Sequence, residues 1–411
     1  MAYCERTRTT LTILDRPRST ISGTPTKEKD WTLDALGNWP GYVTKTAGST
    51  DLDQTRTNNA VNEITGISET TGTAWIDPAY DAAGNMTTIP KPANLTAGFT
   101  ATYDAWNRLV KLVDGMNTVA EYEYDGLNQR IVKSIYVSGS LDHREHVYLN
   151  EQWQDLEIRK ETGGTEDTDP LEQYVWHPYY IDAIVLRDYD PETDGSATRY
   201  YSCQDGNSST TAIIDSSGTV LERYAYTPYG QLIILDADFA LDGDGVSDIA
   251  MRYAFTGRDL DTESGNYFFR NRLCHNRLGN FLTRDPIDYG DGPNLYRYAS
   301  SNPIVFLDPL GTIVVRCECS CTVTVSAEYV SPETEFVSIN PGDNAGAIPE
   351  LCGRACEARS RRRLSCRLSD WKIPGSSPDI SAPFPSYGTY LSNPSKMVSV
   401  PRTASWRGGY S

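Results

Sequence analysis

The sequence has no apolar run of the roughly 18–20 residues that a membrane-spanning helix needs. Its first twenty residues, MAYCERTRTTLTILDRPRST, contain no apolar segment of the kind found in secretion signals. We therefore expect neither a membrane span nor an N-terminal signal peptide.

Basic and catalytic signals are also scarce. The chain has 37 Lys and Arg against 55 Asp and Glu, a formal charge of -18, whereas a nucleic-acid-binding body would carry an excess of positive charge. There are four histidines, and none lies in an HExxH pattern. GxSxG, Walker and GxGxxG motifs are absent as well. The sequence thus argues against a metabolic enzyme and against nucleic-acid binding by the main body. We also expect the protein to be a monomer.

Cysteine is rare in most of the chain and concentrated near its end. Cys4, Cys203 and Cys274 precede residue 313, and the other six lie between Cys317 and Cys366. The three early cysteines read as ordinary thiols.

The late cysteines leave three interpretations open. Cys317, Cys319 and Cys321 alternate, so a strand would place them on one face. Cys352 and Cys356 are one helical turn apart. Such thiols could complete a zinc site, pair as disulfides after export, or stay free.

The chain is rich in Tyr (26), Gly (32) and Pro (23), which favours strands divided by turns. A repeat follows: YDAAGNM, YDAWNRLVKL and YDGLNQRIVKS begin at Tyr80, Tyr103 and Tyr124, 23 and 21 residues apart. An Asp-Gly turn separates the β-forming runs 108–113 and 119–124. The repeat therefore predicts strand–turn–strand units that stack on their neighbours.

Several segments resemble the Rhs/YD-repeat family. ERYAYTPYGQL (222–232) follows the Tyr-Asp repeats, and the blocks at 253–287 and 294–311 closely resemble the Rhs repeat-associated core domain. DWTLDALGNW (30–39) is similar to such proteins too. The main resemblance covers residues 75–311 and relates the chain to polymorphic toxins and to the C component of insecticidal toxin complexes.

The resemblance implies a mainly β fold. Stacked antiparallel hairpins would form a shell fragment that a core domain closes, with a small irregular C-terminal module beyond it. We expect a polar segment of truncated repeats at 1–74, the shell at 75–235, the core domain at 236–311 and a variable module at 312–411. That module is Cys-rich at first, and its Ser-, Pro- and Gly-rich end predicts disorder.

Two Asp-Pro pairs mark the candidate site, at Asp285 and Asp308. Two carboxyl groups held close together cannot both ionise easily, so one can stay protonated while the other activates water. Arg284 could hold Asp285 ionised or position a carbonyl, although neighbours on a strand face opposite sides. The family resemblance implies that the core domain cuts its own chain between Thr312 and Ile313.

The sequence departs from the family pattern at two places. Asp288 stands where the first motif has Gly, and Thr312 stands where Leu is usual. Asp291 is close by and could substitute for a partner. Two interpretations stay open: a working aspartyl-type self-cleavage site, or two strand ends that only shape the core domain.

A loop, LDGDGVSD, offers a further candidate. Asp242, Asp244 and Asp248 flank Gly245 in a pattern that suits calcium. However, Tyr253 stands where an EF-hand needs Glu. The alternative is a solvated loop. No other cofactor is expected.

Three functions are compatible with these observations. The first is an Rhs-type encapsulation scaffold of a toxin system, whose released module would have an immunity protein as partner. The second is a cell-surface adhesion protein that binds a glycan and does not cleave itself. The third is a secreted contact-dependent toxin with a nuclease-type tail, which the basic cluster RSRRRLSCR (359–367) would suit. Each implies a secreted or cell-surface protein that is cytoplasmic before export.

Overall fold

The computed structural model describes residues 24–178 and 180–314 in full. It also gives the backbone of four short strands, β1 (Arg6–Arg8), β25 (Arg316–Thr322), β26 (Val330–Glu335) and β27 (Ser365–Lys372). The described residues form strands and three 3₁₀ turns, η1 (Phe255–Gly257), η2 (Asp288–Asp291) and η3 (Ala299–Ser301). The predicted mainly β fold is confirmed. No helix in this described part is long and apolar enough to cross a membrane.

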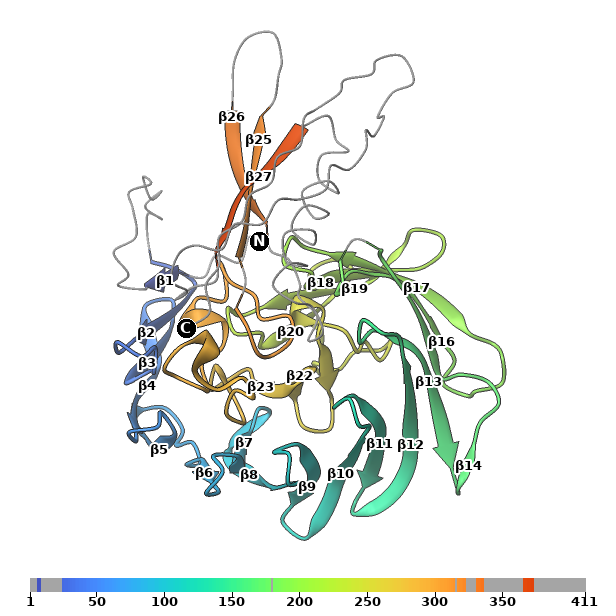
Figure 1. Ribbon diagram of the computed structural model, residues 1–411, viewed down its shortest axis with the longest axis horizontal. Coiled ribbons are helices and arrows are strands. Elements are labelled where there is room, and N and C mark those ends of the chain that lie inside the picture. The colour runs from blue at the N-terminus through green and yellow to red at the C-terminus, as the bar shows by residue number, and fades with distance from the viewer. Residues whose placement is uncertain are drawn as a thin grey trace.

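Two antiparallel sheets form a curved wall, which we call the shell (Figure 1). The first contains β2 (Lys27–Thr32), β3 (Gly41–Thr46), β4 (Ser49–Asn58) and β5 (Ile64–Thr71), with β1 added in parallel. The second follows the chain order, except that β14 pairs only with β13 and β15 takes the next place along the sheet. Its strands are β6 (Ala79–Tyr80), β7 (Met86–Lys91), β8 (Asn94–Tyr103), β9 (Leu109–Asp114), β10 (Asn117–Tyr124), β11 (Arg130–Val137), β12 (Ser140–Leu149), β13 (Asp155–Thr162), β14 (Thr165–Glu166), β15 (Glu172–Trp176), β16 (Ile184–Tyr189), β17 (Thr198–Gln204), β18 (Thr210–Ile214), β19 (Val220–Tyr226) and β20 (Leu232–Asp236).

One turn type connects many of these strands. After β6, the Asp81 carboxylate accepts hydrogen bonds from the amides of Ala83 and Asn85, both at 2.9 Å. Gly84 takes φ 87°, a conformation that favours Gly or Asn. The carboxylate thus replaces the strand partner that these amides lack at the turn. The same side-chain bonds recur at Asp34, Asn59, Asp104, Asp125, Asn150, Asp205 and Asp215.

The two earliest of these turns lie in the segment expected to be polar. Asp34 and Asn59 precede the three repeats that the Tyr-Asp pattern revealed, so the strand–turn–strand unit extends further toward the N-terminus. Amide ladders join neighbouring turns: Asn38 donates to Asn62 at 2.9 Å, and Asn85 donates to Asn107 at 3.0 Å.

The far end of the shell returns to its beginning. Tyr229, in the turn between β19 and β20, packs against Trp39 with ring centroids 4.6 Å apart and against Trp31 at 5.6 Å. Arg56 of β4 lies over Trp39 at 4.8 Å and donates to the carbonyl of Leu278. The contacts of Tyr229 bring the two ends of the shell together, and Arg56 ties the first sheet to the segment inside.

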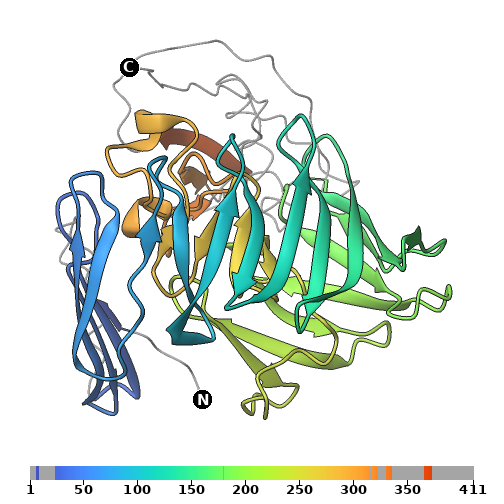
Figure 2. The ribbon, with the colours of Figure 1, turned by 90° about the horizontal axis from the view of Figure 1, so that it is seen from below.

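Residues 252–311 occupy the interior of the shell, and we call them the plug (Figure 1 and Figure 2). The plug contains an antiparallel sheet of β21 (Asp259–Asp261), β22 (Asn266–Phe269), β23 (Arg272–His275) and β24 (Asn280–Phe281). Phe269, Phe281 and Tyr298 meet edge to face at its centre and are at most 1 % exposed. Aromatic pairs of this kind favour such angles.

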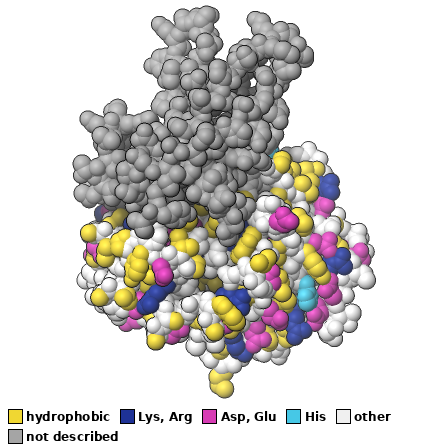
Figure 3. Space-filling view, in the orientation of Figure 1, with side chains coloured by type: hydrophobic (Ala, Val, Ile, Leu, Met, Phe, Trp, Pro, Cys, Tyr) yellow, Lys and Arg dark blue, Asp and Glu magenta, His cyan; other side chains and the backbone are white. Residues whose placement is uncertain are grey.

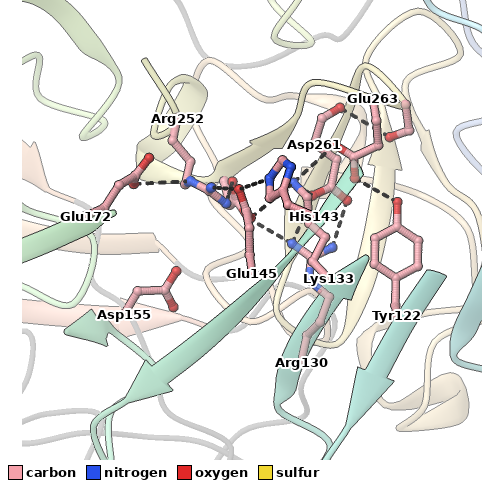
Figure 4. Close-up of polar contacts among 12 residues, drawn as sticks. Tyr122, Arg130, Lys133, His143, Glu145, Asp155, Glu172, Arg252, Asp261 and Glu263 are labelled. Atoms are coloured by element: carbon pink, nitrogen blue, oxygen red, sulfur yellow. Dashed lines mark hydrogen bonds and ion pairs between the residues drawn. The ribbon is translucent and has the colours of Figure 1, made fainter. Parts of the chain in front are cut away.

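Buried ion pairs join the plug to the inner face of the shell (Figure 4). Asp261 of the plug binds Arg130 at 2.8 Å, and Glu263 binds Lys133 at 3.1 Å. In a third pair the charges are exchanged: the plug provides the cation, Arg252, and the shell provides the anion, Glu145. Buried charges are costly unless paired, so this pattern favours one seating of the plug.

On the described part of the face seen in Figure 3, acidic and basic side chains are interspersed with apolar ones and form no patch of one sign.

Candidate functional site

Asp285 and Asp308 meet at one guanidinium group. Nη2 of Arg272, at the start of β23, lies 2.9 Å from Oδ2 of Asp285 and 3.4 Å from Oδ2 of Asp308. The two aspartates are 6 % and 1 % exposed. The structure therefore brings the two Asp-Pro pairs into one buried cluster, although 22 residues separate the two carboxylates in the sequence.

The backbone around Asp285 sets the direction of its carboxylate. The chain leaves β24 at Phe281 and turns sharply, so that Oδ1 of Asp285 accepts a hydrogen bond from the amide of Ile287 at 3.0 Å. Asp288 follows with φ 54°, the left-handed conformation expected of the Gly that it replaces. The turn thus keeps a glycine-like backbone despite the substitution.

Asp308 binds the chain that leaves the plug. Its Oδ1 accepts a hydrogen bond from the amide of Thr312 at 2.9 Å. On the other side, the amide of Val314 donates to Oδ1 of Asp291 at 3.3 Å. Carboxylates therefore contact the main chain on both sides of the Thr312–Ile313 bond.

Three arginines hold the carbonyl groups just before this bond. The Pro309 oxygen accepts from Arg258 at 2.8 Å and from Arg270 at 2.6 Å. The Gly311 oxygen accepts from Nε of Arg272. Hydrogen bonds from ionised donors are the stronger ones, so the segment is held rigidly.

Asp182 of the shell anchors two of these arginines. It pairs with both Arg258 and Arg270, and its side chain is 1 % exposed. Through Arg258 and Arg270, Asp182 therefore connects the chain before the Thr312–Ile313 bond to the shell.

Burial changes the protonation of the carboxyl cluster. It raises the pKa of Asp285 to about 7, and Asp308 adds to the rise while Arg272 opposes it. Burial also raises the pKa of Asp291 to about 7, with a further contribution from Asp308. The pKa of Asp308 itself is raised by burial. Near neutral pH the cluster can hold protonated and ionised carboxyls together, as acid–base chemistry requires.

The partner of Asp285 is Arg272 rather than Arg284. Arg284 donates to Glu63 at 2.8 Å and to the Tyr296 hydroxyl at 3.2 Å, and so joins the plug to the shell. Adjacent residues diverge along an extended chain, which is why sequence neighbours do not pair here. Arg272 lies over the ring of Phe281 at 3.7 Å, and strand pairing within the plug brings it to the site.

The candidate metal sites fare differently. Within the described part of the chain, no three His, Cys, Asp or Glu side chains gather as metal ligands would. Oδ1 of Asp242 accepts from the amides of Asp244 and Gly245, and the amide of Asp248 bonds to Glu222. The loop LDGDGVSD is thus a hydrogen-bonded turn in which its three aspartates do not converge.

The cysteines predicted as zinc ligands or disulfide partners are not among the side chains that the structure describes. The side chains of Cys317, Cys319, Cys321, Cys352 and Cys356 lie outside the described residues. Cys203 and Cys274 are free thiols, the first exposed and the second buried.

Comparisons with known proteins point to toxin systems. The chain is 28% identical over 288 residues to the tRNA3(Ser)-specific nuclease WapA of Bacillus spizizenii, covering 69% of this chain and 11% of that protein. It is 28% identical over 193 residues to the toxin subunit YenC2 of Yersinia entomophaga, covering 46% and 19%. The chain thus spans between a tenth and a fifth of the length of these relatives.

A solved complex, TcdB2-TccC3-Cdc42, aligns with 70% of this chain and 17% of its own chain, at 16% identity and a TM-score of 0.42. No protein-family profile matches the sequence. The sequence relatives confirm the resemblance to Rhs/YD-repeat toxin proteins.

Proposed function

We propose, from this likeness to Rhs/YD-repeat toxin proteins, that the chain is a shell-and-plug scaffold that cuts itself between Thr312 and Ile313. The cut would release residues 313–411 as the effector module. One observation carries the proposal: carboxylates of Asp308 and Asp291 bind the amides around this bond, while Arg272 joins Asp308 to Asp285.

The proposed reaction is hydrolysis by the Asp285–Asp308 pair. The ionised carboxylate takes a proton from a water molecule, whose oxygen attacks the carbonyl carbon of Thr312. The protonated carboxyl gives its proton to the carbonyl oxygen. The tetrahedral intermediate then collapses and the C–N bond breaks. The nitrogen of Ile313 takes the proton that the first carboxyl accepted from water, and one hydroxyl of the intermediate returns a proton to the second carboxylate, so both carboxyls regain their starting states. One water is consumed, and a new carboxyl group and a new amine are formed.

The surrounding side chains serve this reaction by position and charge. Arg272 allows one carboxyl of the pair to ionise in a buried site. The bonds from Arg258, Arg270 and Arg272 fix the carbonyls of Pro309 and Gly311, so the scissile peptide cannot drift from the carboxyl pair. Holding reactants in place supplies a large part of the rate enhancement in such reactions.

The released module would need a partner in the producing cell. We propose that an immunity protein binds it there, and that the scaffold acts in a secreted or cell-surface setting, as toxin relatives do. Adhesion without cleavage makes the opposite prediction for the mass of the purified chain.

Intact-mass measurement tests the proposal. We expect the purified protein to give two fragments, residues 1–312 and 313–411. Asp285→Asn and Asp308→Asn should each give one full-length mass. In each variant a single carboxyl of the pair remains, and it cannot act as acid and base at once. Asp244→Asn, in the exposed loop, is the matched control and should still cleave. A single full-length mass for the unaltered chain would overturn the proposal.

A further inference from the structure

We infer that Asp291 is a positioning residue for the cleavage, holding the main chain on the downstream side of the Thr312–Ile313 bond. The inference rests on the proposed self-cleavage and adds a residue to it. Its starting point is the hydrogen bond from the amide of Val314 to Oδ1 of Asp291 at 3.3 Å.

Side chains hold the main chain on both sides of the bond. Upstream, the carbonyls of Pro309 and Gly311 and the amide of Thr312 are all bonded to side chains. Downstream, the amide of Val314 donates to Oδ1 of Asp291. Asp291 is thus the counterpart, after the bond, of Asp308 and the arginines before it.

The local structure gives Asp291 a firm base. It is the last residue of η2, and the amide of Gly292 closes that turn on the carbonyl of Tyr289 at 3.2 Å. Val314 is 0 % exposed, so the chain is still inside the protein where Asp291 binds it. A hydrogen bond sheltered from water in this way fixes geometry better than an exposed one.

Asp291 also acts on the charge of the reacting pair. The carboxyl groups that face it are Asp308 and Asp285, and Arg297 is the cation that opposes them. Arg272 and Arg258 act on Asp308, and Asp288 acts on Asp285. A negative charge on Asp291 therefore helps the pair to retain a proton at neutral pH.

Two substitutions separate the roles of contact and charge. Asp291→Asn keeps an oxygen that can accept from Val314 but removes the charge. Asp291→Ala removes both. The full chain can be made by in vitro translation with a labelled amino acid, moved to buffers between pH 5 and 9, and followed by the appearance of the two fragments.

We expect Asp291→Ala to slow cleavage by about 10- to 100-fold, since small displacements of a reacting group carry penalties of this order. Asp291→Asn should cleave within a few-fold of the unaltered rate at its optimum, but with its pH–rate profile moved to lower pH. A role in packing alone would change the amount of folded protein without moving that profile. Asp291→Glu keeps both the charge and the acceptor, so its pH–rate profile should match that of the unaltered chain. This variant keeps the test informative if Asp291→Ala fails to fold.

The outcomes distinguish this inference from the proposed function. If the unaltered chain does not cleave, both are overturned. If it cleaves, and Asp308→Asn does not, but both Asp291 variants match the unaltered rate and profile, only the role of Asp291 is overturned.

Discussion

At the scale of single residues, the candidate site depends on one arginine that contacts several groups at once. Arg272 pairs with Asp285 and Asp308, donates to the Gly311 carbonyl and also to the Leu295 carbonyl at 2.9 Å. A planar guanidinium with five donors suits such a junction better than an ammonium group would. The sequence singled out the two aspartates by their Asp-Pro setting and by the family resemblance, but left open whether they meet, which the structure shows. Arg272 could not be predicted, because only the pairing of β23 and β24 brings it there.

Replacing Arg272 tests this account. Arg272→Gln leaves two buried carboxyls without their cation, and breaking a buried pair costs about 3–5 kcal/mol. Because both carboxyls can become protonated, we expect about 3 kcal/mol less stability in urea unfolding, together with loss of the two fragments in the mass spectrum. Arg272→Lys should reach the folded state but cleave itself more slowly than the unaltered chain. It keeps the test informative if the glutamine variant is unfolded.

Arg284→Gln is the matched control. It breaks a partly exposed contact with Glu63, for which about 1 kcal/mol or less is expected, and cleavage should continue. Loss of cleavage in this variant, with retention in Arg272→Gln, would reverse the assignment.

At the scale of elements, the shell is built from a turn whose key residue is Asp or Asn. The Tyr-Asp pattern located three of these turns, at Asp81, Asp104 and Asp125. It did not locate Asn59 or Asn150, where Asn accepts the same amide bonds and the preceding Tyr is absent. A search for Asp or Asn, followed three residues later by Gly or Asn, would have found Asn59, because Asn62 takes positive φ in its turn. It would have missed Asn150, because Trp153, a residue type that rarely adopts positive φ, takes that position.

The turn carboxylate should be replaceable by an amide but not by a methyl group. In Asp104→Ala, the amides of Trp106 and Arg108 lose their acceptor, and the ion pair with Arg108 is lost as well. We expect a loss of about 1–2 kcal/mol in unfolding free energy, as for removal of a helix cap. Asp104→Asn should lose less than half of that, since Asn59 and Asn150 already form the turn. Equal losses in the two variants would show that charge, not acceptance by the side chain, stabilises the turn.

At the scale of the whole molecule, the plug is seated by buried charges as well as by apolar contacts. Carboxylates and cations alternate between the shell and the plug, as Figure 4 shows for Glu145, Arg252 and Glu172. The curved wall and the aromatic segment inside it could be predicted from the Tyr-Asp repeats and from the family resemblance. The ion pairs could not be predicted, because they join residues far apart in the sequence, such as Arg130 and Asp261, which are 131 positions apart.

One buried carboxyl at this interface makes stability depend on pH. Oδ2 of Asp155 accepts a hydrogen bond from the Tyr253 hydroxyl at 2.5 Å. Burial, followed by repulsion from Asp259, raises the pKa of Asp155 from 3.8 to about 6. The folded state thus binds this proton more tightly than the unfolded state does. The stability that Asp155 contributes is present below pH 4 and is lost as the pH rises through about 6.

Asp155→Asn should remove this dependence. The amide keeps an oxygen for Tyr253 and never ionises, so the variant avoids a cost of about 2–3 kcal/mol at neutral pH, by the usual conversion of a shift of this size. Urea unfolding at pH 4.5 and pH 7.5 would measure it on the cleavage-deficient Asp308→Asn background, which keeps the chain in one piece. We expect the variant to gain stability relative to its parent at pH 7.5 and to gain little at pH 4.5. An equal effect at both values would mean that Asp155 is ionised throughout, and that the plug is seated by a charge balance including this carboxylate.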